Sequence, residues 1–484
     1  MPGRGAKDHR GRRTACRLSQ PDLATVERVT TSVRASRSRT HADAGPTVRP
    51  TLAAQLRDAA VWSAVVVVGL LGVALAVRAD VRFGTPGVPF LGEYRLQLRV
   101  GTVLAPAVAT TVLLAVRAGV HRSWRWRPLL VASWVAAFAW TAGLALVEGG
   151  NGFARPVAVS ASALLADVDA FAADPGGFLE RADEADAGLS DEGRARPPGQ
   201  VVLLWVLTRF GLERASSLGV ALTALGCLAV PLVAVAVRSL CGEAAGRALL
   251  PALVLGPWAV WVAVSVDAVV GALTAGVVAL ACLAAEQRDV RYASGSLAVA
   301  SGLLLGVAAQ TSYSAPWLGL AAVLVFFVRR RPALLVLTGL AALVPLFVLQ
   351  ALGFVWPDGL AVASEDFATR VEPTRSYAAW APVAVLVLLI AAGPVLVASA
   401  RAARRTPGWP FLVAALAATG FALFAGFARG EVERTWLPYF PWLLVAAVAP
   451  PRRGAAAATE VSPLLVGLGA ASAVVLQAVL RTAW

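Results

Sequence analysis

Three residues in one polar stretch have side chains suited to catalysis or binding. Asp167 and Asp169 lie two residues apart, and Arg196 opens the motif Arg-Pro-Pro-Gly. A carboxylate can accept a proton from a hydroxyl group or bind a metal ion, and a guanidinium fits the oxygens of a phosphate. We predict Asp167 and Asp169 as catalytic residues and Arg196 as a substrate contact, and we leave open whether a divalent metal takes part. The competing interpretation of each aspartate is a solvated acidic loop.

Asp267 and Arg434 are two further candidates for substrate binding. Asp267 lies in otherwise apolar sequence, where an ionisable side chain is costly and usually faces a cavity or a partner. Arg434 belongs to a charged stretch, residues 429–436, that leads into an apolar run. The alternatives are an aspartate in an ordinary tight turn and an arginine that anchors a helix at the membrane interface.

The elements that must position these residues are membrane helices. Hydrophobic residues make up 58% of the 484 residues and charged residues 15%, and the mean hydropathy is +0.70, whereas about a quarter of a soluble domain is charged. Apolar runs recur from Val61 to Leu480, and many are long enough to cross a bilayer core of about 30 Å. Because the backbone must satisfy its own hydrogen bonds in lipid, helices are expected. The sequence predicts an all-α, polytopic transmembrane protein.

Thirteen membrane spans are predicted, and arginines set their orientation. The spans are residues 61–77, 100–116, 129–147, 217–237, 248–265, 267–285, 296–312, 315–328, 332–350, 381–400, 410–427, 435–449 and 463–480. Every second connection is rich in arginine, as in Arg329-Arg330-Arg331, which fits the positive-inside rule. We therefore predict a multi-pass plasma-membrane protein with a cytoplasmic N-terminus. Since the positive charge lies at helix ends and in the tail, nucleic acid is not an expected partner.

The N-terminal residues differ in composition from the rest. Residues 1–58 contain twelve Arg or Lys and five Asp or Glu, with little apolar periodicity, so we predict a disordered basic cytoplasmic tail before a transmembrane domain at 59–484. The four cysteines lack metal-site spacing. The three histidines fall in segments predicted to be cytoplasmic, so the outer face has no histidine for a metal site.

Two long connections are predicted on the outer face. Residues 148–198 hold ten acidic residues and four arginines, and their interspersed apolar residues predict short amphipathic helices on the bilayer surface. Residues 200–211 form an apolar run too short to span, which we interpret as a re-entrant or juxtamembrane helix. The second long loop, residues 351–380, mixes aromatic and charged residues that suit carbohydrate contacts or any interfacial loop.

The motifs of the first loop resemble those of a known enzyme group. Asp167-Val-Asp169 follows a predicted span, and about 28 residues later a Pro-Pro pair leads into an apolar run. This order resembles the first outer loop of GT-C glycosyltransferases, in particular of the members that use polyprenyl-phosphate sugars, such as protein mannosyltransferases and lipid A aminoarabinose transferases. The arginine-rich turn at residues 238–247 and the sequence Ser265-Val-Asp267 are similar too. The chain differs in having Arg196 where His or Lys is usual, an Asp-x-Asp pair, and two spans before the loop.

The resemblance implies transfer of a sugar from a polyprenyl-phosphate donor to a glycan or lipid acceptor of the cell envelope, at the outer face of the plasma membrane. A carboxylate would deprotonate or orient the acceptor hydroxyl, and cationic groups would hold the departing phosphate. One alternative is a transporter or flippase of lipid-linked envelope intermediates, which should show broken helices, repeats or charges at mid-membrane. The other is a non-catalytic membrane protein.

Overall fold

The computed structural model describes residues 46–85, 87–159, 162–184, 188–263, 265–287, 291–452 and 454–482. The chain divides into two units, Met1–Asp43 and Ala44–Trp484, and the described residues all belong to the second. Most of the predicted tail, residues 1–58, therefore lies outside the described residues. Its predicted end is wrong, because strand β1 occupies Thr47–Val48 and helix α2 already begins at Leu52.

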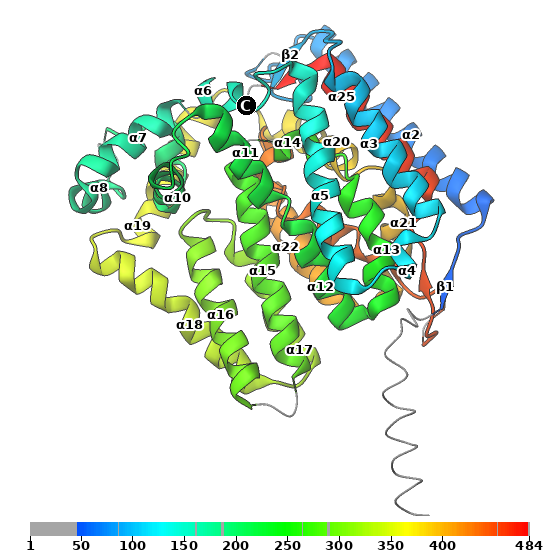
Figure 1. Cartoon of the computed structure of the whole chain (residues 1–484). Coiled ribbons are helices and arrows are strands. Elements are labelled where there is room, and N and C mark those ends of the chain that lie inside the picture. Colours follow the sequence, from blue (N-terminus) through cyan, green and yellow to red (C-terminus); the bar gives the residue numbers. More distant parts are fainter. Residues whose placement is uncertain are drawn as a thin grey trace, which may run out of the picture. The chain divides into compact units, whose positions relative to one another are not determined.

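The described unit consists almost entirely of helices (Figure 1). Its α-helices are α2 (Leu52–Arg78), α3 (Gly101–Arg117), α4 (Val120–Ser123), α5 (Trp126–Ala145), α6 (Arg155–Val159), α7 (Ser162–Ala173), α8 (Pro175–Arg181), α9 (Asp191–Arg194), α10 (Gly199–Arg209), α11 (Ala215–Gly226), α12 (Ala229–Cys241), α13 (Glu243–Val254), α14 (Ala259–Val262), α15 (Val266–Glu286), α16 (Arg291–Ala309), α17 (Pro316–Val328), α18 (Pro332–Ala351), α19 (Trp356–Asp366), α20 (Tyr377–Ala392), α21 (Val395–Ala402), α22 (Trp409–Phe424), α23 (Val432–Thr435), α24 (Phe440–Leu443) and α25 (Pro463–Val479). A π-helix, η2, follows α19 at Phe367–Val371. The 3-10 helices are η1 (Leu146–Glu148), η3 (Ala403–Arg405) and η4 (Val445–Val448). The prediction of an all-α class is confirmed.

Two small sheets join distant parts of the unit. Strand β1 pairs in parallel with β3 (Ala458–Thr459), and β2 (Gly92–Tyr94) pairs antiparallel with β4 (Leu480–Thr482). Glu460, directly after β3, accepts hydrogen bonds from Thr47 and Arg49 beside β1. Both sheets therefore connect residues near the start of the unit to residues near its end.

Six helices among the described residues are long and apolar enough to span a membrane. They are Leu52–Arg78, Trp126–Glu148, Ala215–Cys241, Val266–Glu286, Tyr292–Ala309 and Pro332–Ala351. A seventh span is formed if α20 and α21, which meet at 103°, are taken together. Five more apolar helices have 10–17 residues, among them α3, α17, α22 and α25. The chain is thus a membrane-spanning helical protein, but the predicted count of thirteen spans is not confirmed.

Three predicted spans are not continuous helices. Residues 248–265 break after α13 at Gly256-Pro257, and residues 435–449 are divided by Pro438 and Pro441 into short turns. Residues 381–400 bend sharply at Gly393-Pro394. Proline lacks the N–H that an α-helix requires in its interior and clashes with the preceding turn, so each break has a local cause in the sequence.

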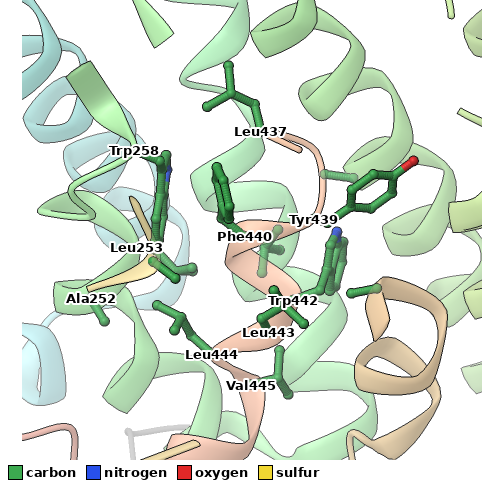
Figure 2. Close-up of a cluster of buried hydrophobic side chains, with 14 of the residues drawn as sticks. Ala252, Leu253, Trp258, Leu437, Tyr439, Phe440, Trp442, Leu443, Leu444 and Val445 are labelled. Carbon is green, nitrogen blue, oxygen red and sulfur yellow. The ribbon is translucent and has the colours of Figure 1, made fainter. Parts of the chain in front are cut away.

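The broken segments are apolar because they lie in the core. Trp258 and Phe440 stack with ring centroids 6.3 Å apart, and Figure 2 shows Leu253, Leu437 and Leu443 around them. Burial in protein and exposure to lipid select the same residue types, which is why these segments resemble spans in the sequence. Irregular backbone is tolerated at membrane depth when protein surrounds it.

The first long loop folds against the helices that follow it. Its short helices α6 to α9 confirm that the loop is helical. The apolar faces of α7 and α8 are buried with α10 and α11 in a second hydrophobic cluster that includes Leu164, Phe171 and Phe178, whereas the sequence analysis placed these faces on the bilayer surface. Figure 1 shows α7, α8 and α10 together on one side, close to α19. The predicted helix at 200–211 is confirmed as α10.

Helix α15 separates two differently charged ends of the unit. Its 21 residues span about 30 Å. At its C-terminal end, Ser239 donates to Glu286, and Arg329 donates to the carbonyl oxygen of Ser239. At its N-terminal end, Asp267 pairs with Arg196 and Arg434. Connections predicted on opposite faces of the membrane thus lie at opposite ends of this helix.

Candidate functional site

A cavity of about 540 Å³ lies at the N-terminal end of α15. Residues of α9, α19, the π-helix η2, α22 and the segment from Phe427 to Tyr439 form its walls. Its charged lining residues are Asp191, Glu192, Arg196, Asp366, Arg370, Arg375, Arg429, Glu431 and Arg434. Its aromatic lining residues are Tyr313, Trp317, Phe367, Phe421, Phe427, Trp436 and Tyr439. The volume falls within the range of small-molecule sites.

Five ionisable side chains meet at the inner end of this cavity, and we call them the buried charge cluster: Glu192, Arg196, Asp267, Glu431 and Arg434. Arg434 lies 3.2 Å from both Asp267 and Glu192 and 3.0 Å from Glu431. Arg196 lies 3.2 Å from Asp267 and 3.7 Å from Glu192. The five residues come from three separate segments, 192–196, 267 and 431–434, so the cluster exists only in the folded chain.

Ion pairing keeps Arg434 and Glu192 charged despite their burial. Burial alone disfavours the charged guanidinium of Arg434, but the nearby carboxylates outweigh this effect and raise its pKa above the ordinary value. Burial also disfavours the charged carboxylate of Glu192, but Arg196 and Arg434 outweigh this and lower its pKa. Arg434 and Glu192 therefore present fixed charges to the cavity.

Short local elements position the members of the cluster. Glu431 stands before α23 and Arg434 lies within it, three residues later. Asp267 lies in the first turn of α15, where the helix dipole favours a negative charge. Arg196 also donates to Gln200, one turn along, at the start of α10. The guanidinium groups are thus held by at least two partners each, which restricts their orientation.

Asp167 supports α9 from behind. It is buried, and both of its oxygens accept hydrogen bonds from Ser190, one from the backbone N–H at 3.1 Å and one from the hydroxyl group. Ser190 in turn accepts from the N–H of Gly193 and caps α9. A Cβ atom at position 193 would lie 2.4 Å from the Asp167 carboxylate, so a larger residue there would displace that carboxylate. Asp167 therefore fixes the helix that carries Glu192.

The structure brings together three of the five predicted site residues. Arg196, Asp267 and Arg434 form the core of the cluster. Asp167 contacts Ser190 at the start of α9, and Asp169 is exposed on α7. Neither aspartate lines the cavity. The catalytic role of the two aspartates stays a prediction.

Glu192 and Glu431 belong to the site but were not singled out in the sequence. A weak signal exists, since Glu192 precedes Arg196 by four residues and Glu431 precedes Arg434 by three, spacings at which side chains on a helical turn meet. The contact between Glu192 and Arg434 joins residues 242 positions apart. Local spacing cannot indicate that contact.

Ion pairs at the outer rim connect the two long loops. Arg194 of α9 lies 3.1 Å from Asp366 at the end of α19 and 2.6 Å from Asp191. Arg370 of the π-helix pairs with Asp191 and lies 3.6 Å from Asp366. We call these four residues the rim pairs. They tie α9 to α19 over the cavity.

Two more arginines, Arg375 and Arg429, complete the charged wall. Arg429 lies 2.9 Å from Glu372. Arg375 donates to the carbonyl oxygen of Arg429 at 3.0 Å, and among the described residues no carboxylate lies within ion-pair distance of it. Arg375 therefore brings a positive charge to the cavity that a bound anion can neutralise.

The opposite wall is aromatic and continues to the apolar surface of α22. Trp317 and Phe421 have ring centroids 5.0 Å apart, and Phe427 lies 6.1 Å from Phe421 and 5.4 Å from Phe367. Phe421 is 49% exposed, and Phe424, one turn along α22, is 82% exposed. On a helix of a membrane protein such surface faces lipid. The cavity thus joins a charged cluster to a surface that a hydrocarbon chain can contact.

No group of three or more His, Cys, Asp or Glu within the described ranges could hold a metal ion. The acidic members of the cluster all contact arginines.

The fold and the site define an integral membrane protein with an amphipathic cavity at one end of its helices. The sequence matches no protein-family model and no curated protein. Among solved structures, it is similar to ArnT from Cupriavidus metallidurans in the apo state, with 20% sequence identity and a TM-score of 0.38 over 56% of this chain and 53% of that chain. A second structure, ArnT bound to undecaprenyl phosphate, gives 20% identity and a TM-score of 0.36 over 52% and 49%.

The chain spans about half the length of these two ArnT structures.

Proposed function

We propose that this protein is a membrane glycosyltransferase that transfers a sugar from a polyprenyl-phosphate donor to a glycan or lipid acceptor of the cell envelope, at the outer face of the plasma membrane. One observation carries the proposal: the same cavity holds an arginine and carboxylate cluster and an aromatic wall that reaches a lipid-facing helix. A donor of this class needs both features, because it has a charged phosphate and a long hydrocarbon chain.

The positive groups suit the phosphate of such a donor. Arg196 and Arg434 are oriented by their carboxylate partners, and Arg375 adds a charge without such a partner among the described residues. Guanidinium groups bind phosphate oxygens through directed, charge-assisted hydrogen bonds. Partial burial strengthens these bonds, since little water competes for the same oxygens. As the sugar leaves, the same groups would stabilise the charge that develops on the phosphate.

The aromatic residues suit the rest of the donor. Phe421 and Phe424 offer an apolar surface for the polyprenyl chain outside the cavity. Inside it, Tyr313, Trp317 and Trp436 offer flat faces on which a sugar ring can stack. We assign the sugar to the space between these rings and the buried charge cluster, which leaves Asp167 to hold α9 in place.

Transport of lipid-linked intermediates is the second candidate, and one observation favours it. The segments 248–265, 381–400 and 435–449 are broken, and broken helices are common near transporter binding sites. Movement of a fluorescent polyprenyl-phosphate sugar across the membrane of vesicles that contain the purified protein would support transport. The charge cluster at the end of α15 rather than at its middle favours the enzyme.

The decisive experiment measures transfer of radiolabelled sugar by purified protein in lipid. A panel of polyprenyl-phosphate sugars serves as donors, and a lipid and glycan extract of cell envelopes serves as the acceptor mixture. We expect transfer from at least one donor, and loss of donor binding in Arg196→Leu and Arg375→Leu. If the wild-type protein binds no donor in the panel, the proposed function is wrong.

A further inference from the structure

We propose that Glu431 is the carboxylate that accepts the proton of the acceptor hydroxyl group. The inference rests on the proposed function and adds a residue that was not among the predicted catalytic residues. Three observations carry it: the backbone conformation of Glu431, its place on the cavity wall, and its single ion pair compared with those of the neighbouring carboxylates.

The backbone at Glu431 is strained. Its φ of 60° and ψ of 9° place it in the left-handed region, which L-residues other than Asn and Asp rarely adopt. Glycine would take this conformation without strain, and Gly430 beside it has a φ of 106°. Strained residues of this kind concentrate at functional sites. The conformation sets Glu431 at the cavity wall directly before α23.

The other carboxylates of the cluster are less suited to accept a proton. Glu192 pairs with both Arg196 and Arg434, and Asp267 pairs with the same two arginines without lining the cavity. Two cationic partners stabilise a carboxylate as an anion and weaken it as a base. Glu431 lines the cavity and among the described residues pairs with one arginine, Arg434, through Oε2.

The step balances in atoms and charge. The acceptor oxygen forms a bond to the anomeric carbon of the sugar while its proton moves to the Glu431 carboxylate. The bond between that carbon and the donor phosphate oxygen breaks, and its electron pair stays on the phosphate. The products are the glycosylated acceptor, the free polyprenyl phosphate and a protonated Glu431, which then releases its proton to water.

The test separates donor binding from transfer. Glu431→Gln should keep donor binding within about threefold of wild type and lose transfer by about 100-fold or more, since positioned general bases contribute this much. The matched control is Glu365→Gln, an exposed glutamate of α19 outside the cavity lining, which should transfer at the wild-type rate. Transfer by Glu431→Gln above a third of the wild-type rate would overturn the assignment.

A second variant distinguishes a chemical role from a structural one. Glu431→Gly removes the carboxylate and suits the left-handed backbone, so relief of backbone strain offsets part of the lost ion pair with Arg434. We expect it to lose transfer and to regain part of it with millimolar formate, a small carboxylate that can enter the vacated space. If formate restores no transfer to Glu431→Gly, the assignment of Glu431 as the base is wrong. A wild-type protein that transfers no sugar would overturn the proposed function instead, and this inference with it.

Discussion

Arginines gather at both ends of α15 but bind different partners. At the C-terminal end they mainly donate to backbone carbonyl oxygens: Arg247 to those of His121 and Trp124, Arg329 to that of Ser239 and Arg331 to that of Gln287. At the cavity end Arg196 and Arg434 pair with carboxylates. Carbonyl oxygens at helix ends need donors, so the first set completes the fold. The second set builds a charged site, although the residue type is the same.

Removing one arginine from each end is the strongest test of this comparison. Arg434→Leu leaves the Glu192, Asp267 and Glu431 carboxylates short of a partner, and unpaired buried charges cost about 3–5 kcal/mol. We expect a large drop in Tm in detergent and no donor binding. Arg247→Leu removes the donor to the carbonyl oxygens of His121 and Trp124 and should also lower Tm.

The two variants should then differ in function. Protein with Arg247→Leu that remains folded at low temperature should bind the donor as tightly as wild type, whereas folded Arg434→Leu should not. If both variants bind the donor equally well, the cavity end of α15 is no more a donor-binding site than its C-terminal end. The measurement is donor binding per folded molecule, with the folded fraction taken from size-exclusion chromatography.

Glu433 lies within one turn of chain of Glu431 and Arg434 and provides a second comparison with the carboxylates of the buried charge cluster. It is buried, accepts a hydrogen bond from the N–H of Leu91, and burial raises its pKa to about 7. A carboxyl group with a raised pKa binds more protons folded than unfolded, so the free energy of unfolding falls as the pH rises from about 4.5 to about 7. We expect this group to cost about 3 kcal/mol above pH 7. Glu433→Gln should remove that pH dependence in a denaturation series between pH 5 and 8, and an unchanged slope would show that Glu433 is ionised in the fold.

The sequence predicted the fold class because hydropathy measures what lipid requires. Most apolar runs became helices near their predicted bounds, as for residues 332–350 and α18. The prediction of continuous spans failed at 248–265 and 435–449 because a buried segment and a lipid-facing segment have the same composition. Asp267 stood out because charges are rare in apolar sequence, Arg196 because of the Pro-Pro motif that it opens, and Arg434 because its charged stretch leads into an apolar run. Glu192 and Glu431 were not, because their partners depend on contacts between distant segments.

The two aspartates of the first long loop provide a smaller test at the cavity end. Asp167→Asn weakens the bonds that hold Ser190 and α9, so Glu192 shifts and transfer should fall by about tenfold, less than the roughly 100-fold that a misplacement of about 1 Å can cost. Asp169 is exposed, and Asp169→Asn should have a smaller effect. If both variants abolish transfer while donor binding persists, the aspartates act in the chemistry, and Glu431 would lose its role.

The rim pairs should give the smallest effect because they are partly exposed. Asp366 lies near both Arg194 and Arg370, which are 14% and 48% exposed, and such pairs contribute about 0.2–1 kcal/mol. Asp366→Asn should lower Tm slightly and speed donor release by about twofold to threefold, as α9 and α19 separate more easily. The difference from wild type should shrink at high salt, because exposed charges are screened. A loss as large as that of Arg434→Leu would mean that rim and cluster form one cooperative unit, so that the closure of the two loops over the cavity helps to assemble the site.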